Sequence, residues 1–200
     1  MKQNYQLMLD KVIQQNEGTL PSLLLHSCCG PCSSYVLEYL IKHFDITVFF
    51  YNPNIYPESE YIKRLDTQRK LIDNMPFENP VKLIAGEYDP ENYIAAVRGQ
   101  EEYREGGPRC STCFTLRLDK TALLAKAEGF DYFATTLTVS PHKNAQIINT
   151  LGFELSEKHG VMWLPSDFKK REGYKRSIEL SAQYDLYRQN YCGCSFAMNY

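Results

Sequence analysis

The sequence predicts an α/β fold, with a mostly parallel sheet and helices on both of its faces. Short apolar segments alternate with longer segments of helical periodicity, and no repeat, low-complexity tract or linker interrupts the 200 residues. Strands that alternate with helices are typical of parallel sheets, because each new parallel strand needs a crossover connection. Since 44% of the residues are hydrophobic, we expect a well-formed core and a single domain over residues 1–200.

The first half of the chain contains three expected strands. Strands are expected where apolar, β-branched and aromatic residues run together, and helices where apolar residues recur every three or four positions. In chain order we expect a helix ending near Gly18, a strand at 23–25, a helix carrying 36–44, a strand at 46–51, a helix after Pro57 and a strand at 81–85.

The second half begins with a helix signal at Asp89-Pro90, where aspartate suits the N-cap and proline the first helical position. The segment 101–108 is polar and contains glycine, which predicts a loop leading into Cys110. After it we expect a helix at 116–127 ended by Gly129, a strand at 132–137, a break at Ser140-Pro141 and a short helix to Leu151.

Composition excludes several classes of protein. The longest apolar runs are far shorter than a membrane span. Residues 1–18 are polar, without the pattern of a signal peptide, so a cytoplasmic location is expected. A net charge of −2 gives no general attraction to nucleic acid, so any contact with a polyanion must come from a local patch.

Seven cysteines are the most informative feature, because they fall into three short groups and none lies elsewhere. An odd number in a reducing compartment argues against a disulfide framework. Buried structural cysteines typically occur singly in apolar stretches, so the grouping indicates metal ligands or redox thiols. The groups are Cys28, Cys29 and Cys32; Cys110 and Cys113; and Cys192 and Cys194.

Three kinds of chemistry suit these thiols. A structural zinc site needs four ligands and so leaves three cysteines over. An iron–sulfur cluster also takes four, and its surplus of three could hold a second metal. Thioredoxin-like chemistry at the Cys29–Cys32 pair would leave the other two groups unexplained. The iron–sulfur interpretation is favoured, and zinc is the main alternative.

The position of the first group indicates where the chemistry lies. The turn at 28–32 directly follows the first expected strand. Sites of open parallel sheets form outside the carboxyl ends of the strands. We therefore expect all three groups of cysteines to converge at that end.

Five stretches of the sequence resemble a known family. They read Leu-Leu-His-Ser-Cys-Cys-Gly-Pro-Cys-Ser at 24–33, Arg-Cys-Ser-Thr-Cys-Phe at 109–114 with Leu-Arg-Leu at 116–118, Thr-Thr-Leu at 135–137 with Ser-Pro-His-Lys at 140–143, Asp-Phe-Lys-Lys at 167–170 with Gly-Tyr at 173–174 and Arg-Ser at 176–177, and Tyr-Arg-Gln-Asn-Tyr-Cys-Gly-Cys at 187–194. The chain resembles the cobalamin-independent epoxyqueuosine reductases of the QueH family. These enzymes perform the last step of queuosine biosynthesis, the deoxygenation of epoxyqueuosine in tRNA.

The resemblance implies a fold similar to the adenine-nucleotide α-hydrolase group, with its PP-loop or HUP-like architecture. In that group a glycine-serine loop binds phosphate, whereas this chain has cysteines at that place, so ATP chemistry is not expected. The family is understood to carry a [4Fe–4S] cluster beside a separate mononuclear iron, reduced by an external electron donor. The resulting expectation assigns Cys29, Cys110, Cys113 and Cys192 to the cluster, and Cys28, Cys32 and Cys194 to the second iron.

The same reaction implies a proton donor and a surface that binds tRNA. The candidate proton donors are His26, Asp167, Tyr174 and Tyr191, each of which could instead have a structural role as a core, capping or packing residue. Residues 167–176 contain five basic and two acidic side chains, which suits phosphate contacts but also describes a solvated surface. The candidate tRNA-binding residues are Lys169, Lys170, Arg171, Lys175, Arg176 and Arg188.

Two other functions are compatible with parts of the sequence. A tRNA sulfurtransferase of the PP-loop kind would need the ATP loop that is absent at 28–33. A non-catalytic RNA-binding module would hold zinc, and analysis of bound metal separates it from an iron enzyme.

Overall fold

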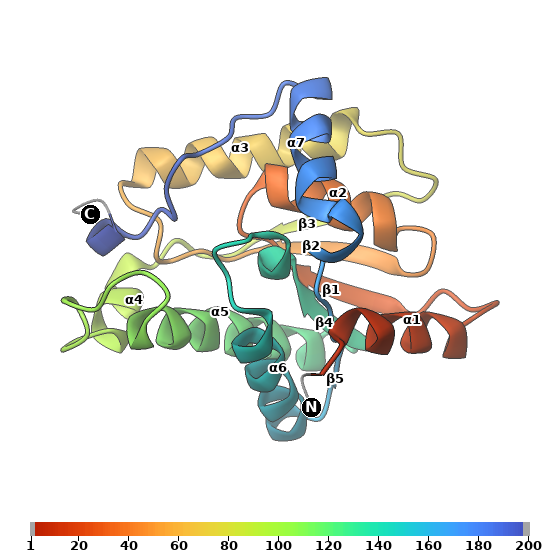
Figure 1. The fold of residues 1–200 in the computed structure, drawn as a ribbon, viewed down its shortest axis with the longest axis horizontal. Helices are drawn as coiled ribbons and strands as arrows, with labels where there is room; N and C mark the ends of the chain where they lie inside the picture. The colour runs from red at the N-terminus through yellow and green to blue at the C-terminus, as the bar shows by residue number, and fades with distance from the viewer. Residues whose placement is uncertain (1–2, 198–200) are drawn as a thin grey trace.

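Five parallel strands form one sheet in the order β3-β2-β1-β4-β5, with helices on both faces (Figure 1). The structure is a computed structural model that describes residues 3–197. The strands are β1 (Ser22–His26), β2 (Asp45–Phe50), β3 (Lys82–Ala85), β4 (Tyr132–Thr135) and β5 (Met162–Trp163). The predicted α/β class with a parallel sheet is confirmed.

Two layers of helices cover the sheet. Helices α2, α3 and α7 pack together on one face, and α5 and α6 pack on the other (Figure 1). The helices are α1 (Tyr5–Gln15), α2 (Gly30–Leu40), α3 (Glu58–Asn74), α4 (Pro90–Ala96), α5 (Pro108–Ala127), α6 (Ala145–His159) and α7 (Gly173–Gln183), with short 3₁₀ turns η1 (Thr136–Val139), η2 (Lys170–Glu172) and η3 (Ser195–Ala197).

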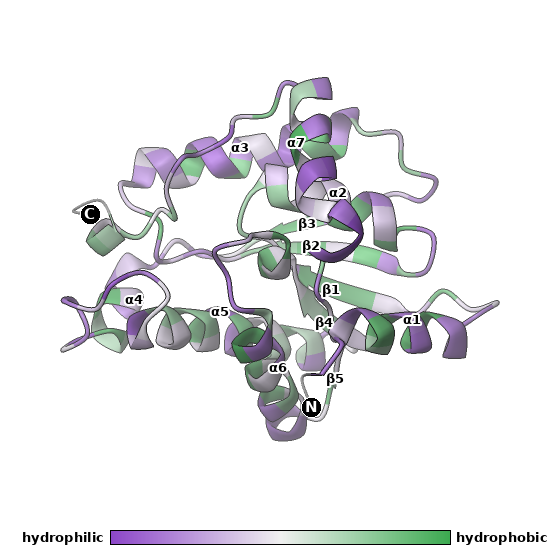
Figure 2. Ribbon diagram, viewed as in Figure 1, coloured by the Kyte–Doolittle hydropathy of each residue, from purple (hydrophilic) through white to green (hydrophobic). Residues whose placement is uncertain are grey.

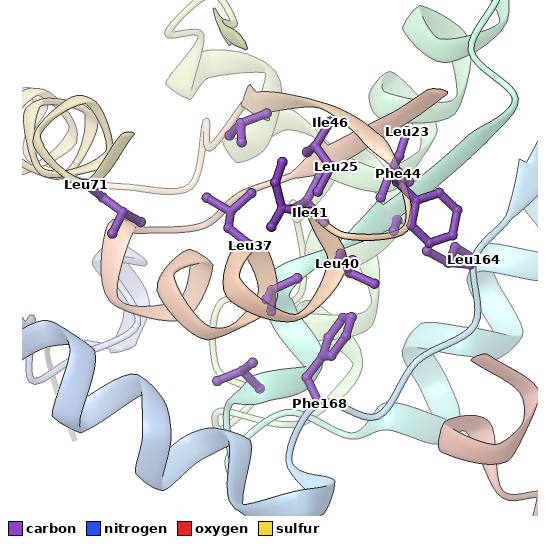
Figure 3. Packing of buried hydrophobic residues seen from close by; sticks show 14 of the residues in the cluster. Leu23, Leu25, Leu37, Leu40, Ile41, Phe44, Ile46, Leu71, Leu164 and Phe168 are labelled. Carbon is purple, nitrogen blue, oxygen red and sulfur yellow. The ribbon is translucent and has the colours of Figure 1, made fainter. Parts of the chain in front are cut away.

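The core follows from the alternation of side chains along each strand. Leu23 and Leu25 of β1 pack in the layer beneath α2, whereas Leu24 packs in the layer beneath α5. Figure 3 shows the first layer, in which Leu37 and Leu40 of α2 lie close to the strand residues. Hydrophobic residues dominate the strands, and the outer helices carry hydrophilic ones (Figure 2). The central strands β2, β1 and β4 are therefore buried on both faces, as in other parallel sheets, whereas the edge strands β3 and β5 are partly exposed.

The topology creates a crevice at one end of the sheet. β1 pairs in parallel with β2 on one side and with β4 on the other. The connections after β1 and β4 lead to opposite faces of the sheet, so the chain separates at their carboxyl ends. The turn at 28–32 and the 3₁₀ turn η1 lie there, since His26 and Thr135 are register partners.

Several predicted boundaries were wrong. α5 begins at Pro108 and not at 116, so Cys110 lies in a helix rather than at the end of a loop. Proline occupies the first helical position there, and the polar run that follows has no apolar periodicity to reveal a helix. α6 continues to His159, eight residues beyond the expected end, and the fourth strand stops at Thr135 and continues as η1. The short β5 was not predicted, because two residues carry no periodic signal.

Among the helices within residues 3–197, none combines the length and the apolar character needed to cross a bilayer.

Candidate metal centre

The first group of cysteines joins β1 to α2. Cys29 is the N-cap of α2, Cys32 lies in its first turn and Cys28 precedes both. The three sulfur atoms lie within 4.8 Å of one another, and those of Cys28 and Cys29 are 3.8 Å apart. A Cβ atom on Gly30 would come within 2.9 Å of the carbonyl oxygen of Thr67, so glycine lets α2 start against α3. The turn therefore places three thiols in position to share one metal or cluster.

The thiols of this group differ in acidity. Hydrogen bonds with Cys29 and Cys32 hold the pKa of Cys28 well below its ordinary value, and Thr136 and Arg117 lower it further. The contact with Cys28 raises the pKa of Cys29 to about 12, and it also raises the pKa of Cys32. The surroundings therefore favour the thiolate form of Cys28, and the thiolate is the form that binds a metal.

The second and third groups meet in one buried cluster. Cys113 of α5 and Cys194 pack together with Tyr93 and Val97. The hydroxyl of Tyr93 lies 2.9 Å from the sulfur of Cys194. Burial raises the pKa of Cys113 to about 12, and the charges of Cys192, Cys194 and Cys110 act in the same direction. The first turns of α5 thus bring the thiol of Cys113 to the segment that carries Cys192 and Cys194.

That segment, the C-terminal strap (residues 187–194), is held by a buried arginine on α3. Arg64 donates from Nη1 to the carbonyl of Cys192 at 3.0 Å and from Nη2 to that of Tyr191 at 3.4 Å. Its Nε pairs with Glu60 at 2.7 Å, and both side chains are largely buried. The carbonyl of Gly193, whose φ of 98° suits glycine, accepts from the backbone of Tyr56 at 2.8 Å. The strap therefore has a fixed path over the cysteines.

A cavity of about 410 Å³ joins the first and third groups of cysteines. Its size lies within the range of about 300–1,000 Å³ that is usual for small-molecule sites. The lining residues used below are Cys28, Cys32, Cys192, Arg117, Lys143, Tyr174, Arg188 and Tyr191.

Besides Arg64, two largely buried cations line this cavity, and neither was among the predicted site residues, although Lys143 belongs to the stretch 140–143 that carries the family resemblance. Lys143 donates to Glu105 at 2.9 Å and to the sulfur of Cys192 at 3.3 Å. Burial acts to lower the pKa of Lys143, but Cys192 and Glu105 outweigh it and raise the value. Arg117 lies one helical turn after Cys113, so the i, i+4 spacing within α5 could have found it, as could the Leu-Arg-Leu stretch at 116–118.

The predicted proton donors fall into two sets. Tyr174 and Tyr191 line the cavity. His26 is fully buried, with Nδ1 at 2.8 Å from Thr135 Oγ1 and Nε2 at 3.1 Å from the carbonyl of Tyr51. Since a carbonyl only accepts, Nε2 carries the proton, and burial lowers the pKa of His26 to about 3. Both ring nitrogens are engaged within the core.

Asp167 lies away from this wall. Its Oδ1 is 2.9 Å from the Nζ of Lys169, and the two residues line a separate cavity of about 400 Å³. Among residues 3–197, those lining the cysteine cavity include neither His26 nor Asp167.

Most of the predicted basic residues form ion pairs within the protein. Lys169 pairs with Asp167, Arg171 with Asp10, Lys175 with Glu172, and Arg176 with Glu38 and Glu179. Lys170 is exposed on η2, and Arg188 lines the cavity while donating to Ser181 Oγ at 3.1 Å. The run is therefore largely neutralised, and these two residues are the most available to an anion.

Comparison with known proteins points to one family. A family model described as epoxyqueuosine reductase QueH matches residues 23–200, which include all seven cysteines. Similar proteins described as epoxyqueuosine reductase QueH come from Streptococcus pyogenes serotype M1 (47% identity, covering 98% of this chain and 80% of that protein) and Staphylococcus epidermidis (47%, 98% and 85%). Another comes from Thermotoga maritima (37%, 88% and 90%).

Proposed function

The chain belongs to the epoxyqueuosine reductase QueH family and is an oxidoreductase, and we propose that it reduces epoxyqueuosine in tRNA to queuosine as one catalytic domain. The reaction converts an epoxide into an alkene, so it consumes two electrons and two protons and releases one water. An external donor supplies the electrons. The observation that carries the proposal beyond the family is the cavity, because thiols from distant parts of the chain meet at its wall.

The donor set fits an iron–sulfur centre. Thiolates are the ligands of [4Fe–4S] clusters, which take four of them. Three sulfurs lie within 4.8 Å of one another, and two further cysteines share one buried cluster. Seven thiols therefore suffice for a [4Fe–4S] cluster and an additional mononuclear iron. When bound, these groups would supply single electrons and a Lewis acid at the cavity.

The division of the cysteines between the two groups is a separate proposal. The assignment of Cys192 to the cluster and Cys194 to the second iron is an expectation from the sequence that stays a prediction. The cavity favours the exchanged assignment, because Cys192 lines the wall beside Cys28 and Cys32, whereas Cys194 packs against Cys113. Iron and sulfide analysis of Cys192→Ser and Cys194→Ser distinguishes the two, since loss of sulfide marks a cluster ligand.

Within the cavity, the protein's own side chains bind the modified base and provide a proton. Modified bases in single-stranded loops are commonly read splayed out, stacked on aromatic rings or arginine planes. Tyr174, Tyr191 and Arg188 offer such surfaces. We assign proton donation to the hydroxyl of Tyr174, because it lines the cavity and is 38% exposed, so a bound nucleoside can reach it. His26 supports the end of β1 instead, since both of its nitrogens are engaged.

Nucleoside analysis tests the function directly. Protein loaded anaerobically with iron and sulfide is incubated with tRNA that contains epoxyqueuosine, with dithionite as reductant and without cobalamin. We expect the epoxyqueuosine peak to fall and a queuosine peak to replace it. The metal-free protein serves as the control, and Tyr174→Phe should slow turnover while leaving iron content unchanged. If the epoxyqueuosine peak persisted while the cluster was fully loaded and reducible, the metal centre would be supported and the proposed reduction of epoxyqueuosine would be refuted.

A further inference from the structure

Arg117 carries a buried positive charge without a carboxylate partner. The residue is 2% exposed, its Nη1 donates to Asn52 Oδ1 at 3.2 Å, and its Nε donates to the carbonyl of Cys113 at 3.3 Å. Its Nη2 is buried and has no hydrogen-bond partner. The ion pairs formed among residues 3–197 do not include Arg117. Because a buried charge without a counter-charge destabilises the folded protein, the position beside Arg117 suits an anion.

The other basic side chains of the cavity have their own partners. Arg64 pairs with Glu60 at 2.7 Å, and Lys143 pairs with Glu105 at 2.9 Å. Arg188 is exposed to water. Of the lysines and arginines that line the cavity in the described part of the chain, Arg117 alone is buried without a carboxylate.

The groups that surround Arg117 indicate which anion pairs with it. Arg117 lines the same cavity as Cys28 and Cys192, and its Nε donates to the carbonyl of Cys113 at 3.3 Å. These three cysteines come from the three different groups of the sequence. The cation therefore lies beside all three groups of cysteines.

We propose that Arg117 is the fixed counter-charge of the iron–sulfur centre, with Nη2 as its free donor, and that it raises the reduction potential of that centre. The inference rests on the proposed iron–sulfur function. Reduction adds one electron and makes the centre one unit more negative. A fixed cation in a site of low dielectric constant stabilises the reduced form more than the oxidised form, so the potential rises.

A redox titration of the loaded protein tests this role. Arg117→Met keeps the length of the side chain and removes its charge, whereas Arg117→Lys keeps the charge. Lys120→Met is the matched control, because it removes one positive charge from an exposed position of α5. Each protein is loaded anaerobically, its iron and sulfide are quantified, and the cluster is titrated with dithionite at controlled potential.

In Arg117→Met we expect the one-electron equilibrium to shift at least tenfold toward the oxidised cluster, which is a fall of about 59 mV in potential. Arg117→Lys should stay within threefold of the wild type, and Lys120→Met should be unchanged. Equal potentials in Arg117→Met and the wild type would overturn the proposal. If the wild type binds no iron and sulfide, the proposed centre itself is refuted, so the two failures are distinguishable.

Thermal unfolding gives a readout that does not depend on redox chemistry. Without the cluster, Arg117→Met should unfold at the same temperature as the wild type or higher, because a desolvated charge has been removed. On loading with the cluster, its unfolding temperature should rise less than that of the wild type. An equal rise in both proteins would contradict the role of counter-charge. Should the methionine variant not fold, Arg117→Gln takes its place in both experiments.

Discussion

The two ends of the sheet satisfy their polar groups in different ways. At the amino end, Ser22 donates from its backbone N–H and its hydroxyl to Asp131 Oδ2, each at 2.8 Å, in a position exposed to water. At the carboxyl end, His26, Asn52 and Arg117 are buried and depend on one another and on nearby backbone. At the amino end water can replace a hydrogen bond that is lost, whereas at the buried carboxyl end no water takes the place of a lost hydrogen bond.

Because of this difference, stability and function depend on different parts of the molecule. The carboxyl end contains buried polar atoms without hydrogen-bond partners, among them Arg117 Nη2, Asn54 Oδ1 and Gln189 Oε1. Such atoms cost stability, on the order of 1–3 kcal/mol each. The apolar layers between the two ends must therefore hold the fold, and the cysteine end can be specialised for binding a charged cofactor.

The largest effect is expected at the carboxyl end, where ligands can be removed without unfolding the protein. Cys113→Ser should lower iron content and abolish turnover, because a serine hydroxyl is a poor ligand for an iron–sulfur cluster. The metal-free variant should unfold within a few degrees of the metal-free wild type. Ser111→Ala, between the two cysteines of α5, is the matched control and should retain iron. Full iron loading of a Cys110→Ser/Cys113→Ser double variant would remove both residues from the ligand set.

The second largest effect is expected in the apolar layers between the two ends of the sheet, and it concerns the stability of the fold alone. Phe133 of β4 is fully buried, and its ring centroid lies 5.0 Å from that of Trp163. Phe133→Ala should lower the free energy of unfolding of the metal-free protein by about 3–5 kcal/mol, as measured by urea denaturation. Leu123→Ala, at a position of α5 that is 50% exposed, should change it by less than about 0.5 kcal/mol.

The iron content of the folded Phe133→Ala protein should equal that of the wild type. If the folded variant lost its iron, the core and the cysteine end would not be separable, and the comparison of the two regions would fail.

The sequence was sufficient to predict the architecture and the convergence of the cysteines. Periodicity located β1 and β2, and the turn that follows β1 placed Cys28 at the carboxyl end, since parallel strands end at a common edge. It placed Arg117 in a stretch that resembles the family, but it did not reveal that the charge of this residue is buried. An arginine within a helix usually faces water, and only the packing of α5 against the sheet shows that this one is buried.

Packing also changed the roles expected of individual residues. Histidine is a common proton donor, but the side chain of His26 lies in the core at the end of β1. There its two ring nitrogens form hydrogen bonds with Thr135 and with the carbonyl of Tyr51. The ion pairs of the basic run join residues far apart in the chain, such as Arg171 with Asp10, so charge counting along the sequence overstated its free charge.

The smallest effect concerns binding of tRNA, and it compares exposed lysines at the two ends. Lys170 is exposed on η2, near the segment whose Tyr174 lines the cavity, whereas Lys82 is exposed at the start of β3, at the amino end of the sheet. Each phosphate contact releases condensed counterions, so its loss reduces the slope of log affinity against log salt concentration. Lys170→Ala should lower that slope by about one unit at most, and Lys82→Ala should leave it unchanged.

Replacing Lys169, Lys170 and Arg171 together should add little to the effect of Lys170→Ala, because Lys169 and Arg171 already pair with Asp167 and Asp10. Measurement of binding to epoxyqueuosine-containing tRNA over a range of salt concentrations decides the matter. Equal slopes for Lys170→Ala and Lys82→Ala would make the basic run an ordinary solvated surface and leave tRNA recognition to the cavity alone.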